Sequence, residues 1–313
     1  MPHPGAHGSG ASRPCAGDAA TERTASPTVS VVMPVHGDAQ DIGHQLAALS
    51  LQTYPDWWEV VVADNGCTDA TLEVVRSWSA RVPNLRIVPA RARRGANHAR
   101  NQGAAAAAGH LLVFCDSDDV VATNWLEALC RAAVDADLVG GHVDVDVLNG
   151  PTVRAWRDSL TVDGLPEGHD FLPHVVSANC AIWRDVYEAA GGWDEEFPVA
   201  GDDVDLSWRV QLRGGKIAFA PDAVVYYRLR PGILALARQM VEYGMAAALL
   251  YKKFRDVGAQ RPPAIIGLKY WVRLLQRGPG MMTTAAGRGR WVHDLAYEWG
   301  RLRGGLRHRV LFW

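Results

Sequence analysis

Short apolar runs alternate with helical patterns along the first 135 residues of the chain. Four runs are rich in Val, Ile and Leu and are almost uninterrupted by polar residues, which is typical of strands buried on both faces of a parallel sheet. These runs are residues 29–35, 60–63, 85–88 and 111–115. Apolar residues three or four positions apart predict helices at residues 41–52, 69–78, 96–108 and 124–134. The alternation predicts a doubly wound, mostly parallel α/β sheet flanked by helices.

The pattern becomes less regular after residue 138. Residues 142–147 alternate between apolar and polar and predict a half-exposed strand, whereas residues 149–177 are polar and rich in turn formers and predict a mobile loop. A helix at 202–213, a strand within 216–227 and a helical pattern from 233 onward follow. Residues 1–27 are mostly Gly, Ala, Ser, Pro and charged residues and predict a disordered leader.

The composition is that of a globular protein, with 48% hydrophobic and 21% charged residues in a chain of 313. The net charge of -2 and the lack of a recognised nucleic-acid-binding fold argue against a nucleic-acid partner. Five scattered cysteines without a CxxC pair indicate neither a zinc site nor a disulfide framework, and favour a reducing cytoplasm. No unbroken apolar run reaches about 18 residues, so the sequence predicts no membrane-spanning helix.

The last part of the chain is basic and aromatic. Residues 261–313 contain ten Arg or Lys and only two acidic residues, together with four Trp and one Phe. Two interpretations are open. The tail either packs on the main domain with its arginines in solvent, or makes a peripheral contact with the anionic inner face of a membrane.

An acidic cluster, Asp116-Ser117-Asp118-Asp119, follows the fourth predicted strand. Three carboxylates in four residues repel one another unless water or a cation compensates them. A divalent metal held by one or two carboxylates and by substrate phosphates is a common reason for this arrangement. The alternative is a solvated turn in which an Asp caps the next helix.

A second acidic turn, at residues 64–69, follows the second predicted strand. Because ligands of doubly wound sheets bind beyond the carboxyl ends of the strands, Asp64 is a candidate for contact with a base or a ribose. Arginines near the third strand (Arg91, Arg93, Arg94 and Arg100) are candidates for phosphate contact or, alternatively, a solvated helix entrance. Neither GxGxxG nor a Walker A sequence occurs, which disfavours dinucleotide oxidoreductases and P-loop enzymes.

The third acidic region spans residues 191–209, where carboxylates alternate with two tryptophans. Aromatic faces beside carboxylates suit carbohydrate, and a carboxylate at a helix start suits a general base that deprotonates an acceptor hydroxyl. Helix capping and tryptophan packing in the core are the alternative explanation for these residues.

The ordered set of these motifs resembles glycosyltransferase family 2, over roughly residues 28–230. The matching segments are residues 29–35 with Pro34, the 64–69 turn, Arg94-Gly95 leading to residues 99–103, the 116–119 cluster, Asn179 with Arg184, residues 191–195 and residues 201–206. Each segment is weak evidence alone, but their order is specific. The resemblance implies the GT-A fold and an inverting transfer of a sugar, by direct displacement, from a nucleotide diphosphate to an acceptor hydroxyl.

The resemblance also implies roles for individual residues. Nucleotide-binding residues would be Asp64, Arg94, Asp118 and Pro34. Metal ligands for Mg²⁺ or Mn²⁺ would be Asp119, Asp118 and Asp116. The general base would be Asp203, with Asp202 and Asp205 as rivals. Contacts to the acceptor or the sugar would come from Asn179, Trp193 and Asp194.

Two departures from the family pattern affect these expectations. Many relatives carry a metal-binding histidine near the end of the strand after the base helix, whereas residues 224–228 of this chain contain none. Two alternatives follow: metal binding is weaker, or a tyrosine of that strand or Arg228 contacts the diphosphate instead. The QxxRW motif of processive synthases is also missing, which favours the transfer of a single sugar.

We therefore expect a GT-A catalytic domain at residues 28–232, with a nucleotide-binding half at 28–135 and an acceptor-binding half at 136–232. A helical basic region is expected at 233–313. The donor would be a UDP- or GDP-linked sugar, and the acceptor a small molecule, a glycan or a lipid-linked molecule. A sugar-phosphate nucleotidyltransferase and a catalytically silent nucleotide-sugar-binding protein are the alternative functions.

Overall fold

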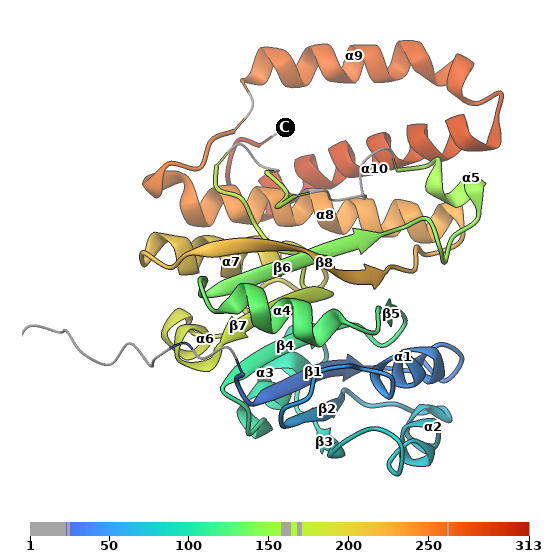
Figure 1. Ribbon diagram of the computed structural model, residues 1–313. Helices are drawn as coiled ribbons and strands as arrows, with labels where there is room; N and C mark the ends of the chain where they lie inside the picture. The colour runs from blue at the N-terminus through green and yellow to red at the C-terminus, as the bar shows by residue number, and fades with distance from the viewer. Residues whose placement is uncertain (1–22, 24–25, 158–163, 168–170, 262, 313) are drawn as a thin grey trace, which may run out of the picture.

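The computed structural model describes residues 23, 26–157, 164–167, 171–261 and 263–312. Its centre is an eight-stranded sheet with the strand order β3-β2-β1-β4-β7-β6-β8-β5 (Figure 1). The strands are β1 Val29–Val35, β2 Trp58–Asp64, β3 Leu85–Pro89, β4 Leu111–Cys115, β5 Val120–Val121, β6 Leu138–Asp144, β7 Asn179–Trp183 and β8 Ile217–Tyr226. The four strands from β3 to β4 are mutually parallel, and β6 is parallel to β8. Only β7 and β5 run antiparallel to their neighbours, so the mostly parallel sheet predicted from the sequence is confirmed.

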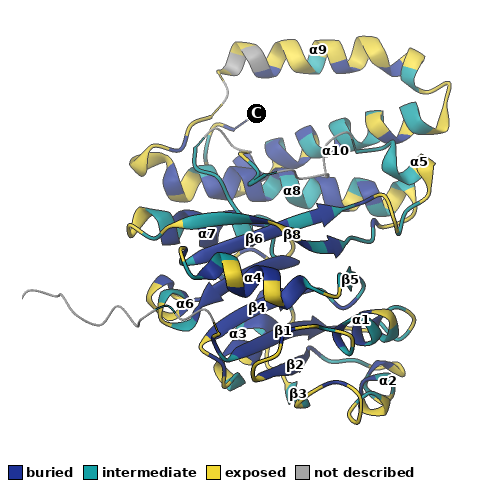
Figure 2. Ribbon diagram, viewed as in Figure 1, coloured by how far each residue is buried: buried dark blue, intermediate teal, exposed yellow. Residues whose placement is uncertain are grey.

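Helices cover both faces of this sheet (Figure 1). They are α1 Ile42–Leu49, α2 Thr71–Ser77, α3 Ala96–Ala106, α4 Trp125–Ala133, α5 Pro151–Arg154, α6 Arg184–Ala190 and α7 Asp202–Leu212. One apolar core lies between the sheet and α1, α2 and α4, and a second lies between the sheet and α3, α6 and α7. Strands β1, β2, β4 and β7 are buried along their whole length, as their continuous apolar runs predict (Figure 2).

The second half of the sheet departs from the sequence expectation. The half-exposed strand expected at 142–147 is strand β6, which begins earlier, at Leu138, and ends at Asp144. Its first four residues are buried because β7 and β8 flank it on both sides. The alternating pattern therefore indicates only the last part of β6, which is less buried. Strand β7 and helix α6 were not expected, because Asn179–Trp183 is too short an apolar run to separate from a buried loop.

The predicted disordered leader at 1–27 lies mostly outside the described residues. The expected mobile loop at 149–177 is described only in part, and that part contains α5. Within the leader, Arg23 forms ion pairs with Asp137 and Asp185 and stacks over the Trp183 ring, 4.6 Å from its centroid.

Three further helices complete the chain: α8 Ile233–Phe254, followed by the 3₁₀ turn η1 Arg255–Val257, then α9 Ala264–Met281 and α10 Ala285–His308. Helix α8 packs on α7, where Phe254 contacts Trp208 edge to face at 5.1 Å. Its other side packs closely on α10. A side chain at Gly244 or Gly300 would collide with the opposite backbone, so glycine lets the two helices touch.

Among the described residues, one stretch, Ile233–Val257, is long and apolar enough to cross a membrane by length and composition. The sequence predicts no membrane-spanning helix here, because Arg238 and Glu242 interrupt the apolar run. In the structure this stretch is helix α8 with the turn η1. Helix α8 packs between α7 and α10, and less than half of the most apolar 18-residue segment is buried.

Candidate functional site

The first elements of the site are the carboxyl ends of β1, β2 and β4, which meet at one edge of the sheet because these strands are parallel. Asp64 is the last residue of β2 and is almost fully buried. Its Oδ1 accepts hydrogen bonds from the amides of Gly66 (3.0 Å) and Cys67 (2.8 Å), and its Oδ2 accepts one from Arg91 Nε (2.8 Å). Burial raises the pKa of Asp64, but the hydrogen bonds from Cys67 and Arg91 outweigh it and hold the pKa below its ordinary value. Asp64 is therefore a fixed, ionised acceptor.

Asn65 fixes the loop that faces Asp64. Its side-chain nitrogen donates to the carbonyls of Ala90 (2.6 Å) and Arg93 (2.8 Å), and its Oδ1 accepts from the Gly95 amide (2.9 Å). Because one side chain binds three points of the segment between β3 and α3, the arginines of that segment are held at the edge of β2. In the sequence, Asn65 is visible only as a residue of the 64–69 turn.

Arg94, the arginine favoured for nucleotide binding, lies beside His36 at the end of β1. Its Nη2 is 2.8 Å from His36 Nε2, and His36 Nδ1 is 3.0 Å from the Asn65 carbonyl. The direct partner of Asp64 is Arg91. Pro34 is buried in β1, opposite Ala63 and one residue before the strand ends.

The carboxylates of Asp116, Asp118 and Asp119 converge just after β4. Each offers an oxygen, and these three oxygens lie within 4.8 Å of one another. Asp119 is fully buried, and its Oδ1 accepts a hydrogen bond from the Arg228 amide (2.7 Å). Its Oδ2 is buried with no hydrogen-bond partner among the residues that the structure describes. A buried carboxylate oxygen without a donor is costly, and a bound cation would compensate it.

Burial and mutual repulsion raise the pKa values of two aspartates in this cluster. Burial and the charges of Asp116 and Asp38 raise the pKa of Asp118 to about 6. Burial and the charges of Asp118 and Asp116 raise the pKa of Asp119 well above its ordinary value. The protein alone thus stabilises the charged form of these groups poorly, as expected of a site that gathers carboxylates for a cation.

Arg228 follows the end of β8, the strand near whose end the family resemblance led us to expect a metal-binding histidine. Its amide binds Asp119, its Nε donates to the Asp118 carbonyl (2.9 Å), and its Nη2 lies 3.3 Å from Asp41 Oδ1. The end of β8 is therefore tied to the acidic cluster by an arginine, which places a cation beside that cluster.

Arg100 connects the acidic cluster to the start of α7. Its guanidinium is buried and donates to Asp116 Oδ1 (2.8 Å) and to Asp202 Oδ2 (3.0 Å). Two acidic motifs that are 86 residues apart in the sequence thereby share one cation. Arg100 was a candidate for phosphate contact or for a solvated helix entrance, but its buried guanidinium is bound to carboxylates.

The three candidate bases at the start of α7 have different surroundings. Gly201 precedes the helix with a left-handed backbone (φ 80°), and the acidic side chains of the first turn favour the positive end of the helix dipole. Asp202 is buried against Arg100, and burial together with the neighbouring Asp203 raises its pKa to about 7. Asp203 is partly exposed, and its Oδ2 accepts a long hydrogen bond from the Ser177 amide (3.3 Å). Burial also raises the pKa of Asp203 above its ordinary value.

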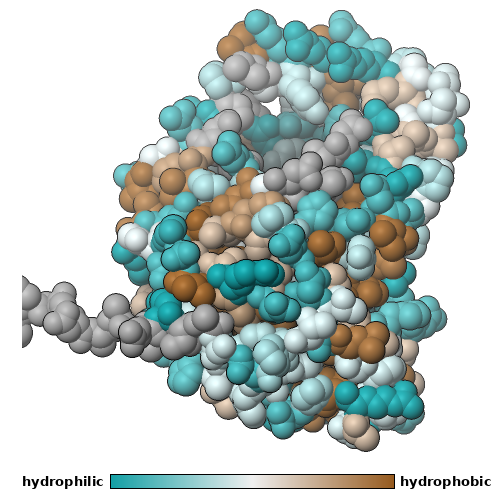
Figure 3. Space-filling model, viewed as in Figure 1, coloured by the Kyte–Doolittle hydropathy of each residue, from teal (hydrophilic) through white to brown (hydrophobic). Residues whose placement is uncertain are grey.

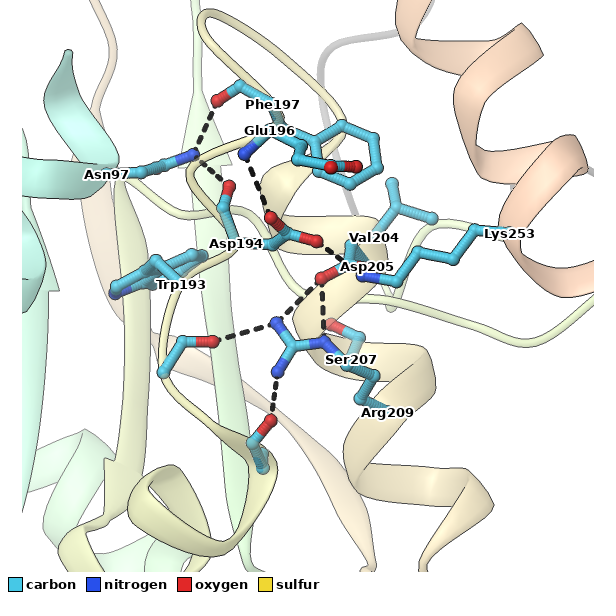
Figure 4. A network of polar contacts seen from close by, with 12 residues as sticks. Asn97, Trp193, Asp194, Glu196, Phe197, Val204, Asp205, Ser207, Arg209 and Lys253 are labelled. Atoms are coloured by element: carbon cyan, nitrogen blue, oxygen red, sulfur yellow. Dashed lines mark hydrogen bonds and ion pairs between the residues drawn. The ribbon is translucent and has the colours of Figure 1, made fainter. Parts of the chain in front are cut away.

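Asp205 is held in a network of ion pairs (Figure 4). Arg209 Nε is 2.7 Å from its Oδ2, and Lys253 Nζ of α8 is 2.5 Å from its Oδ1. The same Lys253 Nζ lies 2.5 Å from Asp194 Oδ2, whose other oxygen accepts from the Glu196 amide. Asp205 is fully buried, and each of its oxygens lies within 2.7 Å of a cation, although the Oδ1 contact with Lys253 is an ion pair without hydrogen-bond geometry. Neither oxygen is open to an acceptor hydroxyl. This geometry argues against Asp205 as the base and favours a structural role.

Asn179 and Trp193 are also placed differently from the sequence expectation. Asn179 is fully buried, and its amide links Trp125 Nε1 to the carbonyls of His142 and Ala223, each at 2.8 Å. Trp193 is buried against Phe114 in an edge-to-face contact at 5.1 Å. Neither side chain presents a surface to an acceptor, because the first holds three elements of the sheet together and the second fills the core. The Asp194 carboxylate forms an ion pair with Lys253.

Comparisons with known proteins agree with this arrangement. The model of glycosyl transferase family 2 matches residues 30–191, and that of glycosyl transferase family group 2 matches residues 111–295. Glycosyltransferase AglE of Haloferax volcanii is 33% identical over 208 residues, which are 66% of this chain and 68% of AglE. The pre-mycofactocin glycosyltransferase of Mycobacterium tuberculosis is 28% identical over 267 residues, which are 81% of this chain and only 53% of that relative.

Two solved structures have the same fold. The mannosyltransferase PcManGT from Pyrobaculum calidifontis, in complex with GDP-Man and Mn²⁺, superposes with a TM-score of 0.63 at 21% identity, covering 89% of this chain and 87% of its own. TarS 1–349 of S. aureus in complex with UDP-GlcNAc gives 0.54 at 17% identity, covering 90% and 92%. With the acidic cluster, the sheet order and these matches together, the chain belongs to glycosyltransferase family 2 and is a glycosyltransferase with the GT-A fold.

Proposed function

We propose that this enzyme transfers a single sugar from a UDP- or GDP-linked donor to an acceptor hydroxyl, with inversion at the anomeric carbon and with a divalent metal. The observation that carries the proposal is the acidic cluster itself. Three carboxylates converge within 4.8 Å, and one buried oxygen of Asp119 has no hydrogen-bond partner in the described part of the chain. The neighbouring Asp64 supplies an ionised acceptor for the donor's base.

Asp119, Asp118 and Asp116 fit a hard cation, because Mg²⁺ and Mn²⁺ prefer carboxylate oxygens and substrate phosphates as ligands. Asp119 and Asp118 would hold the ion, while Asp116 is shared with Arg100. When bound, the ion would offset the negative charge that develops on the leaving diphosphate. Arg228 would add a second positive charge at the same edge.

The acceptor hydroxyl would be deprotonated by Asp203. Of the three acidic residues at the start of α7, Asp203 is the most exposed, and no ion pair holds it in the described structure. Its raised pKa suits a group that must take a proton near neutral pH. Asp202 remains the second candidate, because only its Oδ2 is bound to Arg100.

The first half of the domain, residues 28–135, would bind the nucleotide and residues 136–232 the acceptor. The family matches do not favour a sugar-phosphate nucleotidyltransferase or a silent binding protein. Cys67, Cys115, Cys130 and Cys180 are free thiols, which fits the reducing cytoplasm that we propose as the location.

The reaction can be tested by offering UDP- and GDP-linked sugars with a panel of hydroxyl acceptors and following nucleoside diphosphate release. We expect release to require Mn²⁺ or Mg²⁺ and to stop when EDTA is added. Proton NMR of the product should show the opposite anomeric configuration from the donor. A product of unchanged configuration, or full turnover in EDTA, would overturn the proposed mechanism while leaving the family assignment intact.

A further inference from the structure

Helix α9 exposes an apolar stripe to solvent. Ile265, Leu268, Val272 and Leu275 are 60%, 61%, 46% and 61% exposed. Their spacing of three or four residues places them on one face of the helix. Figure 2 shows α9 as the most exposed helix at the top of the molecule, in contrast to the buried sheet. A contiguous apolar surface of this kind marks a site of interaction with another molecule or a membrane.

A basic stripe lies beside the apolar one. Lys269, Arg273 and Arg277 follow at intervals of four residues, and all three are exposed. Helix α9 contains no acidic residue, and no carboxylate of the described chain forms an ion pair with these three side chains. Figure 3 shows hydrophilic and hydrophobic residues next to each other along the top edge of the molecule, where α9 lies.

The apolar stripe continues into a groove. Helices α9 and α10 are joined by a short turn and diverge from it (Figure 1). Near the turn they are held together, since Trp291 Nε1 donates to the Leu274 carbonyl (3.1 Å). Between them and α8 lies a groove of about 1080 Å³. Its lining is almost entirely apolar and includes Ile265, Leu268 and Trp271 of α9 and Leu295 and Trp299 of α10.

We propose that α9 docks on the headgroup region of an anionic phospholipid bilayer, with its apolar stripe inserted, its basic stripe against the lipid phosphates and one acyl chain in the groove. An apolar stripe beside a basic, acid-free stripe is the pattern of helices that lie in the membrane interface. A second copy of this chain fits less well, because two basic faces repel each other. RNA fits less well, because its interfaces are polar and this stripe is not.

The assignment refines the sequence interpretation of the basic tail. Helix α10 packs on α8 and accounts for the buried part of the tail, whereas α9 provides the surface. Contact of α9 with an anionic membrane rests on the proposed cytoplasmic location and adds the membrane surface to it. The assay described next contains no donor and measures no turnover, so it fails or succeeds independently of the proposed transfer reaction.

The test is flotation of the full-length enzyme with phosphatidylcholine vesicles that contain or lack phosphatidylglycerol. We expect binding only to the anionic vesicles and loss of binding as salt shortens the Debye length from about 10 Å at 0.1 M to about 3 Å at 1 M. The variant Lys269→Glu/Arg273→Glu/Arg277→Glu should bind about 100-fold more weakly, since each basic residue near such a surface contributes about fivefold.

A matched control carries the same change of charge elsewhere. Arg76→Glu/Arg81→Glu/Arg131→Glu alters three exposed arginines on the main domain and should bind like wild type. An apolar pair gives a second comparison. Leu268→Gln/Leu275→Gln should weaken binding at least tenfold, whereas Leu51→Gln/Leu212→Gln, which alters exposed leucines elsewhere, should not. Equal melting temperatures would show that all variants fold.

The groove is tested with phospholipids brominated on one acyl chain, which quench tryptophan fluorescence on contact. Wild type should be quenched, and Trp271→Phe/Trp299→Phe should lose most of that quenching while still binding vesicles. Failure of wild type to float with anionic vesicles at low salt would overturn the proposal. So would an equal loss in the Arg76/Arg81/Arg131 control, or concentration-dependent dimerisation that the α9 charge reversal abolishes.

Discussion

The carboxylates after β4 and those around the start of α7 differ in the cations that face them. At the end of β4, Asp118 and Asp119 repel each other, and Asp119 keeps one buried oxygen without a partner in the described structure. Around α7, Asp202 is paired with Arg100, and Asp205 with both Arg209 and Lys253. Both regions are rich in acidic residues, and Asp116 shares Arg100 with Asp202. Within the described structure, however, Asp118 and Asp119 form no ion pair, whereas Asp202 and Asp205 do.

The contrast separates a binding site from a framework. Uncompensated buried carboxylates destabilise the fold and are retained where a ligand supplies the missing charge. Carboxylates already paired with cations hold elements together. Here Lys253 joins Asp205 of α7 to α8, and Arg209, which pairs with Asp205, also donates to the Gly192 carbonyl. The exception in the second region is Asp203, which forms no ion pair with the cations that the structure describes, and this exception is what makes it a candidate base.

The largest effect should come from Asp119→Asn. We expect turnover to fall by roughly 10³- to 10⁵-fold, because the metal's stabilisation of the leaving group is worth several kcal/mol. The metal-free protein should melt at the same temperature as wild type or higher, because a repelled buried charge has been removed. Differential scanning calorimetry in EDTA, with rate measurements in Mn²⁺, checks both parts. A large loss of stability in EDTA would show that Asp119 belongs to the framework instead.

Next in size is Asp203→Asn, which should lower kcat by about 10²- to 10⁴-fold, the usual contribution of a general base. Binding of the donor with Mn²⁺ should remain near wild type, since the base acts on the acceptor. In wild type, kcat should rise with pH through the raised pKa of Asp203, because only the ionised form accepts a proton. A near-normal kcat for Asp203→Asn would shift the role to Asp202, whose asparagine variant is the matched comparison.

The sequence predicted the fold and the first acidic region well, because both depend on local patterns. A buried strand followed by three Asp is visible in the sequence, and the α/β alternation follows from periodicity. The second region could not be resolved in this way. The partner of Asp205 that distinguishes it from Asp203 is Lys253, which lies 48 residues later on α8. Likewise, Asn179 joins elements that are contributed by three distant segments.

Asp205→Asn should affect stability more than chemistry. Removing the buried carboxylate takes away the ion-pair partner of Arg209, while Lys253 keeps Asp194, and costs up to about 3–5 kcal/mol. We expect a lower free energy of unfolding by that amount, with donor binding retained at temperatures below the transition. Lys253→Met should lower the free energy of unfolding by less in the Asp205→Asn variant than in wild type. A double-mutant cycle measured by urea denaturation tests this. Full additivity would show that the two side chains do not interact.

The smallest effect concerns acid stability. Burial raises the pKa of Asp194, but hydrogen bonding to Lys253 and the Glu196 amide outweighs it, so the folded-state pKa is lowered. A lowered pKa contributes stability that is present above the ordinary aspartate value of about 3.9 and is lost as pH falls through the folded-state pKa. The melting temperatures of wild type and Lys253→Met should therefore differ at pH 7. The difference should shrink as the pH falls from about 3.9 through the lowered pKa of Asp194. A difference that is the same at every pH would remove Asp194 from the account.

The central claim is that, of the two acidic regions compared, the carboxylates after β4 are those that require an external cation. Isothermal titration of UDP and GDP into metal-free wild-type enzyme, with and without Mn²⁺, tests it most directly. We predict that one of the two nucleotides binds much more tightly with Mn²⁺, and that Asp119→Asn loses this enhancement while Asp205→Asn keeps it. Equal nucleotide affinity with and without Mn²⁺, or an enhancement that survives in Asp119→Asn, would contradict the claim.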